Sequence, residues 1–142
     1  MPTYANGPTP ALPIAGGGIS LVSANPLEMV LRQQVAPATY TGTATITAAE
    51  LATRILSYTG AGHTLTLPTA AQLDAYMPNA QQNDSFDFTV IATTGTATLN
   101  ATVTGLTSVG ALTTAASTAT MFRLRKTNAP GATSAWVIYR AG

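Results

Sequence analysis

Alternating apolar and polar residues mark several short strands along this chain. In the clearest example Phe86, Phe88 and Val90 alternate with Asp87 and Thr89. Successive side chains of a strand point to opposite faces, so this pattern predicts a strand with one buried face. Further strands are expected at 41–46, 54–58, 63–67, 97–104, 108–112, 119–126 and 134–140. About eight short strands separated by turns predict an all-β fold, here an antiparallel β-sandwich or jelly roll.

Two short helices are expected between these strands, each with a capping box. Thr47 precedes Glu50, and Thr69 precedes Gln72, at the spacing that lets each side chain bond the other's backbone amide. Pro78 ends the second helix. The two helix starts, TAAEL at 47–51 and TAAQL at 69–73, follow similar strands. They suggest a weak internal pseudo-repeat, but two copies are too few for a solenoid, so we interpret them as local reuse of a good helix start.

The segment 1–40 differs from the rest of the chain. It contains six of the nine prolines and the glycine run Gly16–Gly18, and dense proline disfavours both helix and sheet pairing. The sequence therefore predicts an extended N-terminal arm at 1–40 and a β-sandwich body at 41–142. A floppy tail is the alternative, although the arm is more apolar than a tail requires. We expect the arm to contact a partner.

Composition narrows the class of protein further. Only 8% of residues are charged and the net charge is +1, while 46% are hydrophobic and 26 are threonine. This composition predicts a folded body with a neutral, hydroxylated surface, and it gives little attraction to nucleic acid. There is no cysteine, hence no disulfide. The longest apolar stretch, residues 11–22, is interrupted by Pro13 and Gly16–Gly18, so we expect no membrane span.

Candidate catalytic chemistry is sparse. His63 is the sole histidine, and without cysteine the commonest zinc sites are not available. Asp84 and Asp87 lie three apart, so on a strand they face opposite sides. We expect Asp84 in a turn, Asp87 on the outer strand face, and Asp74 on the exposed side of its helix. The sequence predicts no enzyme, no cofactor and no metal site.

Basic residues concentrate near the C-terminus. Arg123, Arg125 and Lys126 form the densest cluster, and Arg140 is expected on an adjacent strand. One interpretation is that these charges protect an outer strand face or edge from aggregation, which is common. The other is a patch that docks on an acidic surface.

Several of these segments together resemble a known family. LPTAAQLDAYMPNA with NDSFDFTVI, followed by FRLRK and the closing WVIYR strand, is similar to the cement (decoration) proteins of tailed double-stranded DNA phages. The resemblance covers roughly residues 42–140. It implies a jelly-roll virion protein, made in the host cytoplasm, that binds the outer capsid surface and bridges neighbouring capsomers. The implied partners are the major capsid protein and the chain itself, as a homodimer or homotrimer, with no nucleic acid and no membrane.

The residues expected to contact the capsid or another subunit combine the apolar positions of the arm with the basic pair. They are Ile14, Ile19, Leu21, Val22, Leu27, Met29, Leu31, Arg32, Arg123 and Arg125. The alternative function is a glycan- or receptor-binding module of a phage fibre or tail, because jelly rolls also serve as lectins. A glycosidase would need two facing carboxylates, and the chain has only five acidic residues.

Overall fold

The computed structural model describes residues 33–142. All of these residues except the first two form one compact unit, Val35–Gly142. Its strands and helices, in chain order, are β1 (Ala38–Tyr40), β2 (Ala44–Thr45), α1 (Ala48–Leu51), β3 (Ile55–Tyr58), β4 (His63–Thr66), α2 (Ala70–Tyr76), β5 (Ser85–Ala92), β6 (Ala97–Asn100), β7 (Leu106–Val109), β8 (Thr113–Thr114), β9 (Thr118–Lys126) and β10 (Trp136–Arg140).

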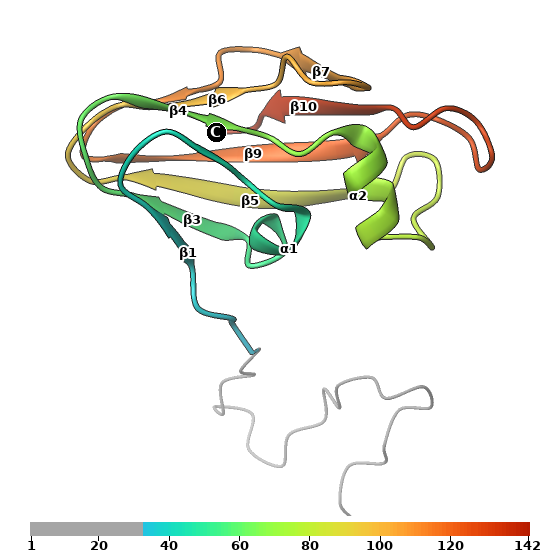
Figure 1. Cartoon of the computed structure of the whole chain (residues 1–142), viewed down its shortest axis with the longest axis horizontal. Helices are drawn as coiled ribbons and strands as arrows, with labels where there is room; N and C mark the ends of the chain where they lie inside the picture. Colours follow the sequence, from blue (N-terminus) through green and yellow to red (C-terminus); the bar gives the residue numbers. More distant parts are fainter. Residues whose placement is uncertain (1–32) are drawn as a thin grey trace, which may run out of the picture. The chain divides into compact units, whose positions relative to one another are not determined.

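The described strands form two mixed sheets, which confirms a β-rich fold (Figure 1). The six-stranded sheet has the order β1-β3-β5-β9-β10-β7, and the four-stranded sheet has the order β2-β4-β6-β8. Five of the eight strand pairs are parallel. The antiparallel arrangement expected from the sequence is therefore only partly correct, since it applies to β5 with β9, β9 with β10, and β6 with β8.

Four of the five parallel pairs arise because the chain changes sheet at each connection from β1 to β6. Successive strands of one sheet are then separated by a strand of the other, and they run in the same direction. Ile55 pairs with Thr89 in one sheet and His63 with Ala97 in the other, so both registers join residues at the same separation in sequence. The units β3–β4 and β5–β6 are therefore stacked strand–turn–strand arches.

The two similar helix starts acquire a structural meaning from this stacking. Helix α1 follows β2, α2 follows β4, and these two strands are parallel neighbours. Both helices consequently begin at the same end of the four-stranded sheet, towards the right in Figure 1. The two similar helix starts, predicted to be local reuse, therefore belong to a structural repeat, because each follows one of two adjacent parallel strands. Both capping boxes are confirmed, with Thr47 paired to Glu50 and Thr69 paired to Gln72.

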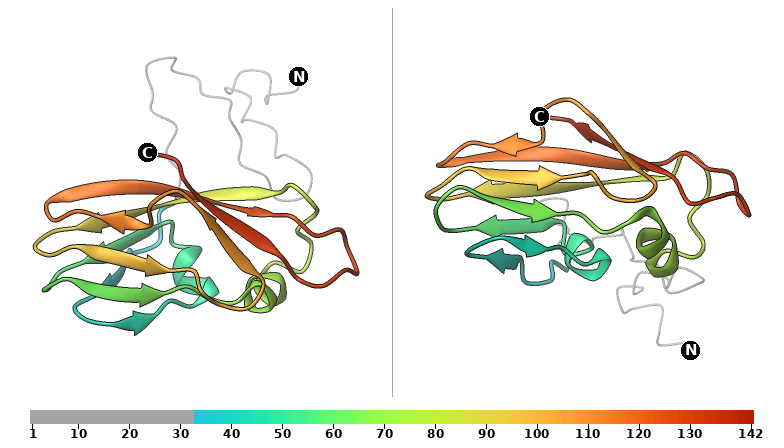
Figure 2. Two further views of the ribbon diagram at one scale, coloured as in Figure 1. Left: turned by 90° about the horizontal axis from the view of Figure 1, so that it is seen from above. Right: turned by 45° about the horizontal axis from the view of Figure 1, so that its top comes forward.

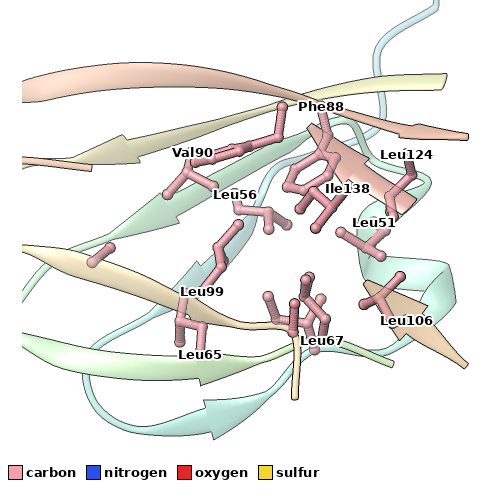
Figure 3. Close-up of a cluster of buried hydrophobic side chains, with 14 of the residues drawn as sticks. Leu51, Leu56, Leu65, Leu67, Phe88, Val90, Leu99, Leu106, Leu124 and Ile138 are labelled. Atoms are coloured by element: carbon pink, nitrogen blue, oxygen red, sulfur yellow. The ribbon is translucent and has the colours of Figure 1, made fainter. Parts of the chain in front are cut away.

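The core lies between the two sheets, which form separate layers in Figure 2. Leu65 and Leu99 of the four-stranded sheet point towards Leu56 and Val90 of the six-stranded sheet (Figure 3). Phe88 lies on the same inner face and stacks on Phe122 of β9, with ring centroids 5.7 Å apart. The alternation predicted for β5, β9 and β10 is confirmed by their burial patterns, with one face buried and the other open to solvent.

Several strand boundaries differ from the sequence prediction. The strand expected at 97–104 ends at Asn100, because its side-chain Oδ1 accepts a hydrogen bond from the Thr102 amide and turns the backbone. The strand expected at 41–46 is reduced to β2. In place of one strand at 108–112 the chain forms β7 and β8. Strand β1 lies within the range predicted as an arm, so the body begins before residue 41.

Candidate interaction surfaces

Most of the contact residues expected from the sequence lie outside the described residues. This applies to Ile14, Ile19, Leu21, Val22, Leu27, Met29, Leu31 and Arg32. The other two, Arg123 and Arg125, are on β9, whose side chains at these positions point away from the core. Strand β9 lies between β5 and β10. It is not an edge strand, so the protection of a sheet edge does not explain these arginines, whereas a place on an outer face does.

We call the side of the six-stranded sheet that faces away from the core the outer face. It consists of alternate residues of adjacent strands, and the registers place Ile55 beside Thr89 and Thr89 beside Met121. Ile91 and Ala119 form a neighbouring pair. The remaining members are Thr39, Ser57, Ser85, Asp87, Arg123, Arg125, Val137, Tyr139, Thr107 and Val109.

Several large apolar side chains lie exposed on the outer face. Ile91, Met121 and Val109 retain 36%, 40% and 54% of their surface in contact with solvent, and they are three of the five exposed large hydrophobic residues in the described chain. Ile55 and Val137 beside them are half-buried. Apolar side chains grouped on a surface in this way are typical of an interaction site.

The charges on the outer face are largely satisfied within it. The Arg123 Nε and Nη2 atoms donate to the two carboxylate oxygens of Asp87 at 2.6 and 2.8 Å. This bidentate hydrogen bond lowers the pKa of the Asp87 carboxyl. Arg125 donates to Asn83 at 2.8 Å and to the Tyr139 hydroxyl at 2.9 Å. The face therefore offers a nearly neutral surface, not a strongly basic patch.

The predicted basic cluster is divided by the fold. Lys126 has the same strand parity as Phe122 and Leu124, so it points inward, where its side chain is only 7% exposed. Arg140 shares the parity of the inward-pointing residues of β10, and it donates to the Thr113 carbonyl at 3.2 Å. Lys126 therefore does not belong to an exposed patch with Arg123 and Arg125, whereas Arg140 lies on the strand adjacent to β9, as predicted.

Asp74 is also placed differently from the prediction. Its Oδ1 atom accepts hydrogen bonds from Lys126 Nζ at 2.7 Å and from Trp136 Nε1 at 2.8 Å. Burial opposes ionisation of Asp74, but hydrogen bonds from Lys126, Ser134 and Trp136 outweigh it and lower the pKa of the carboxyl. The cluster of Asp74, Lys126 and Trp136 thus fastens α2 to β9 and β10.

The sequence did contain a signal for this cluster. Asp74 lies one helical turn after Ala70 and directly after Leu73, which places it on the edge of the apolar stripe of α2. Lys126 continues the alternation of Phe122 and Leu124. The charge of Asp74 and Lys126 favoured exposed positions. The periodicity of α2 and of β9 agreed better with where the structure places them.

A hollow lies at the helical end of the body, beside Tyr76. It has a volume of about 500 Å³ and is lined by Tyr76, Met77, Pro78, Asn79, Ala80, Asp84, Ser85, Phe86 and Trp136. Two smaller depressions, one against α1 and one beside Arg54, also have Tyr76 in their walls. Tyr76 is 50% exposed, so its ring stands where these depressions meet.

The other residues considered for chemistry have structural surroundings. His63 is exposed at the start of β4, with its Nδ1 3.3 Å from the Thr43 hydroxyl. Asp84 accepts a hydrogen bond from the Gln81 amide at 2.8 Å, as expected of a turn residue. Within residues 33–142 no group of three or more histidine or acidic side chains is arranged to hold a metal ion. No helix of this part of the chain is long and apolar enough to cross a membrane.

No protein-family model, curated protein or solved structure matches this chain.

Proposed function

We propose that this chain is a capsid cement (decoration) protein of a tailed double-stranded DNA phage. It would bind the outer surface of the assembled icosahedral shell and bridge neighbouring capsomers. The proposal rests on the resemblance of four segments to that family and on the nature of the outer face. It assigns the chain no catalytic role and no cofactor. The resemblance also implies a jelly-roll sandwich, and we propose that the two sheets are a form of it with parallel pairs.

The observation that carries the proposal is the exposed apolar surface around Ile91 and Met121. A broad sheet face with few free charges suits contact with another protein, whereas binding to nucleic acid requires many unpaired basic groups. Asp87 and Arg123 satisfy each other on this face. The net charge of +1 leaves little repulsion between copies. We therefore propose the major capsid protein and other copies of this chain as partners.

A cement protein stabilises a shell by mass action. A molecule that binds only to the assembled shell shifts the equilibrium between free and assembled subunits towards the shell. When one oligomer contacts two capsomers, the second contact is intramolecular, so modest contacts act together at a high effective concentration. The body suits this role because its registers and core fix the positions of the outer-face residues relative to one another.

The test is co-sedimentation with shells that lack this chain, assembled from the major capsid protein of the same phage. Wild-type protein is expected to pellet with the shells and to raise the temperature at which they break. Met121→Lys places a charge in the middle of the outer face, so it is expected to reduce pelleting by at least about tenfold. Thr98→Lys is the matched control, because Thr98 points away from the core on the other sheet. It is expected to pellet normally.

Two results would reject this proposal. One is a wild-type protein that stays in the supernatant at every concentration tested. The other is a Met121→Lys variant that pellets as well as wild type although its melting temperature shows that it is folded. The contribution expected of residues 1–32 lies outside the described residues and stays a prediction. Deleting these residues and repeating the sedimentation measures it separately.

A fibre or tail module that binds a glycan or receptor is the second candidate function. The observation that favours it is the hollow beside Tyr76, which combines an exposed aromatic ring with polar side chains.

A further inference from the structure

The hollow beside Tyr76 has the composition of a site for a polar ligand with an apolar side. One wall is aromatic, with Tyr76 exposed at the rim and Phe86 and Trp136 deeper. Pockets that bind small ligands have volumes of roughly 300–1,000 Å³ and combine apolar walls with a few placed polar groups. The volume of about 500 Å³ lies within this range.

The hollow is also lined by hydrogen-bonding groups that have capacity to spare. The Asp84 carboxylate uses one oxygen, Oδ2, to accept from the Gln81 amide. Its other oxygen, the Asn79 side-chain amide and the Ser85 hydroxyl make no hydrogen bond within the described residues. Together these groups supply both donors and acceptors from one short loop.

The loop that carries these polar groups is held firmly in place. The Asn83 amide donates to the Lys126 carbonyl, and the Lys126 amide donates to the Asp84 carbonyl, both at 2.9 Å. The Ala80 amide donates to the Met77 carbonyl at 3.0 Å, which closes the turn after α2. The polar groups are therefore positioned before any ligand arrives, and a ligand does not bear the cost of ordering the loop.

The aromatic wall is fixed in a similar way. Trp136 donates its indole N–H to Asp74, which sets the orientation of the ring. Phe86 packs edge-on against it, with ring centroids 6.2 Å apart. Tyr76 is the aromatic residue that remains free to cover a ligand, because its ring is exposed and its hydroxyl makes no hydrogen bond in the described part of the chain.

We propose that this hollow binds a neutral saccharide. The C–H-rich face of a sugar ring packs on an aromatic ring, and its hydroxyls, each both donor and acceptor, match the carboxylate, amide and hydroxyl that also line the hollow. Asp84 disfavours an anionic ligand. A purely apolar ligand would leave the polar groups of the loop without partners, which costs binding free energy.

This inference does not depend on the proposed capsid role, because the hollow shares only Ser85 with the outer face and the apolar residues Ile91 and Met121 lie outside it. A cement protein that also holds a saccharide would attach the virion to a glycan-bearing surface. The same site would serve a fibre or tail module. The experiment below uses the free full-length protein, so its result is independent of whether the chain binds a shell.

Trp136 gives a direct readout, since it is the only tryptophan of the chain and it lines the hollow. The full-length protein is titrated with maltotriose, triacetylchitotriose and lactose while tryptophan fluorescence is followed. Amide chemical shifts are recorded in parallel. At least one of these saccharides is expected to change the fluorescence saturably and to shift the amides of residues 76–86. If none does so up to about 10 mM, roughly ten times the Kd of a weak complex near about 1 mM, the inference is wrong.

Variants decide whether binding occurs at this site. Tyr76→Ala is expected to weaken binding by at least about tenfold through loss of the stacking surface. Ser85→Ala combined with Asn79→Ala is expected to weaken it while the aromatic wall is intact. Val109→Ala is the matched control, because Val109 is similarly exposed but lies on the outer face. Binding that survives Tyr76→Ala unchanged, in a variant whose melting temperature equals that of wild type, overturns the assignment.

Discussion

Removing the Asp74 carboxylate tests how the helical end of the body is held to the sheets. Asp74→Asn keeps the size of the side chain and an oxygen for the Trp136 N–H, but it removes the negative charge opposite Lys126. The Lys126 ammonium is then left in a position where its side chain is only 7% exposed. The variant is therefore expected to fold and to be markedly less stable.

The magnitude follows from the burial of the two partners. Breaking a buried ion pair costs about 3–5 kcal/mol, because the remaining charge has no compensation. Asp74 retains 21% exposure, so water partly replaces it, and we expect a loss of about 3 kcal/mol, the lower end of that range. Domains of this size have a free energy of unfolding of about 5–15 kcal/mol, so the loss is a large fraction of the total.

A double-mutant cycle separates the ion pair from the other contacts of each residue. Lys126→Met alone is expected to cost less than Asp74→Asn, because Asp74 keeps its hydrogen bond from Trp136 and some solvent. The double variant is expected to be more stable than the sum of the single losses predicts, by about 2 kcal/mol. Asp87→Asn is the control for loss of a paired carboxylate, since the Asp87–Arg123 pair lies on the exposed outer face, and its effect should be much smaller.

Urea unfolding followed by far-ultraviolet circular dichroism is the appropriate assay. Fluorescence is unsuitable because Trp136 contacts the mutated residue. The pKa of Asp74 is lowered in the folded state, so its stabilising contribution is present in full above about pH 3.9, the unfolded value. The contribution is lost as the pH falls through the folded pKa. The difference between wild type and Asp74→Asn should shrink accordingly. Additive single losses, or a difference that persists at acidic pH, would refute this reasoning.

Three further predictions concern the stacking of the layers and the core, each measured by urea unfolding. Gly95→Ala is expected to destabilise strongly, since a Cβ there would collide with the backbone of residues 60–62 in the turn of the next arch, whereas Gly42→Ala meets nothing within 4 Å and should be neutral. Equal effects of the two would contradict the stacked-arch description. Thr69→Ala removes the cap of α2 and should cost about 1 kcal/mol, restored in part by Ser at the same position. Phe122→Ala leaves a cavity against Phe88 and should cost about 3–5 kcal/mol, and a loss below about 1 kcal/mol would show that the site is not tightly packed.

Local chemistry explains which parts of the fold were predictable. Each capping box involves two side chains within one helical turn, and each strand pattern depends on its own residues. Thr69 with Gln72 and the alternation of Phe86, Phe88 and Val90 were therefore correctly assigned. The parallel pairing was not predictable in this way, because the direction of a neighbouring strand depends on the path of the chain between the two.

The candidate surfaces likewise have some features that the sequence predicted and others that only the folded chain brings together. The sequence placed Arg123 and Arg125 on an exposed strand face, which is correct, but it grouped Lys126 with them by charge. It gave no indication of the apolar outer face, because Ile91 and Met121 are far apart in the sequence and become neighbours only when β5 pairs with β9. The hollow beside Tyr76 likewise combines the end of α2 with the starts of β5 and β10.

Local sequence is enough to specify the elements of this protein: short strands with one apolar face, two capped helices, and a body that carries few charges. These properties depend on the backbone geometry and side chains of a few consecutive residues. The direction of pairing, the burial of Lys126 against Asp74, and the gathering of apolar side chains on the outer face arise only in the folded molecule. Each of these features depends on contacts between residues far apart in the chain. The free energy of those contacts is gained only when particular strands become neighbours.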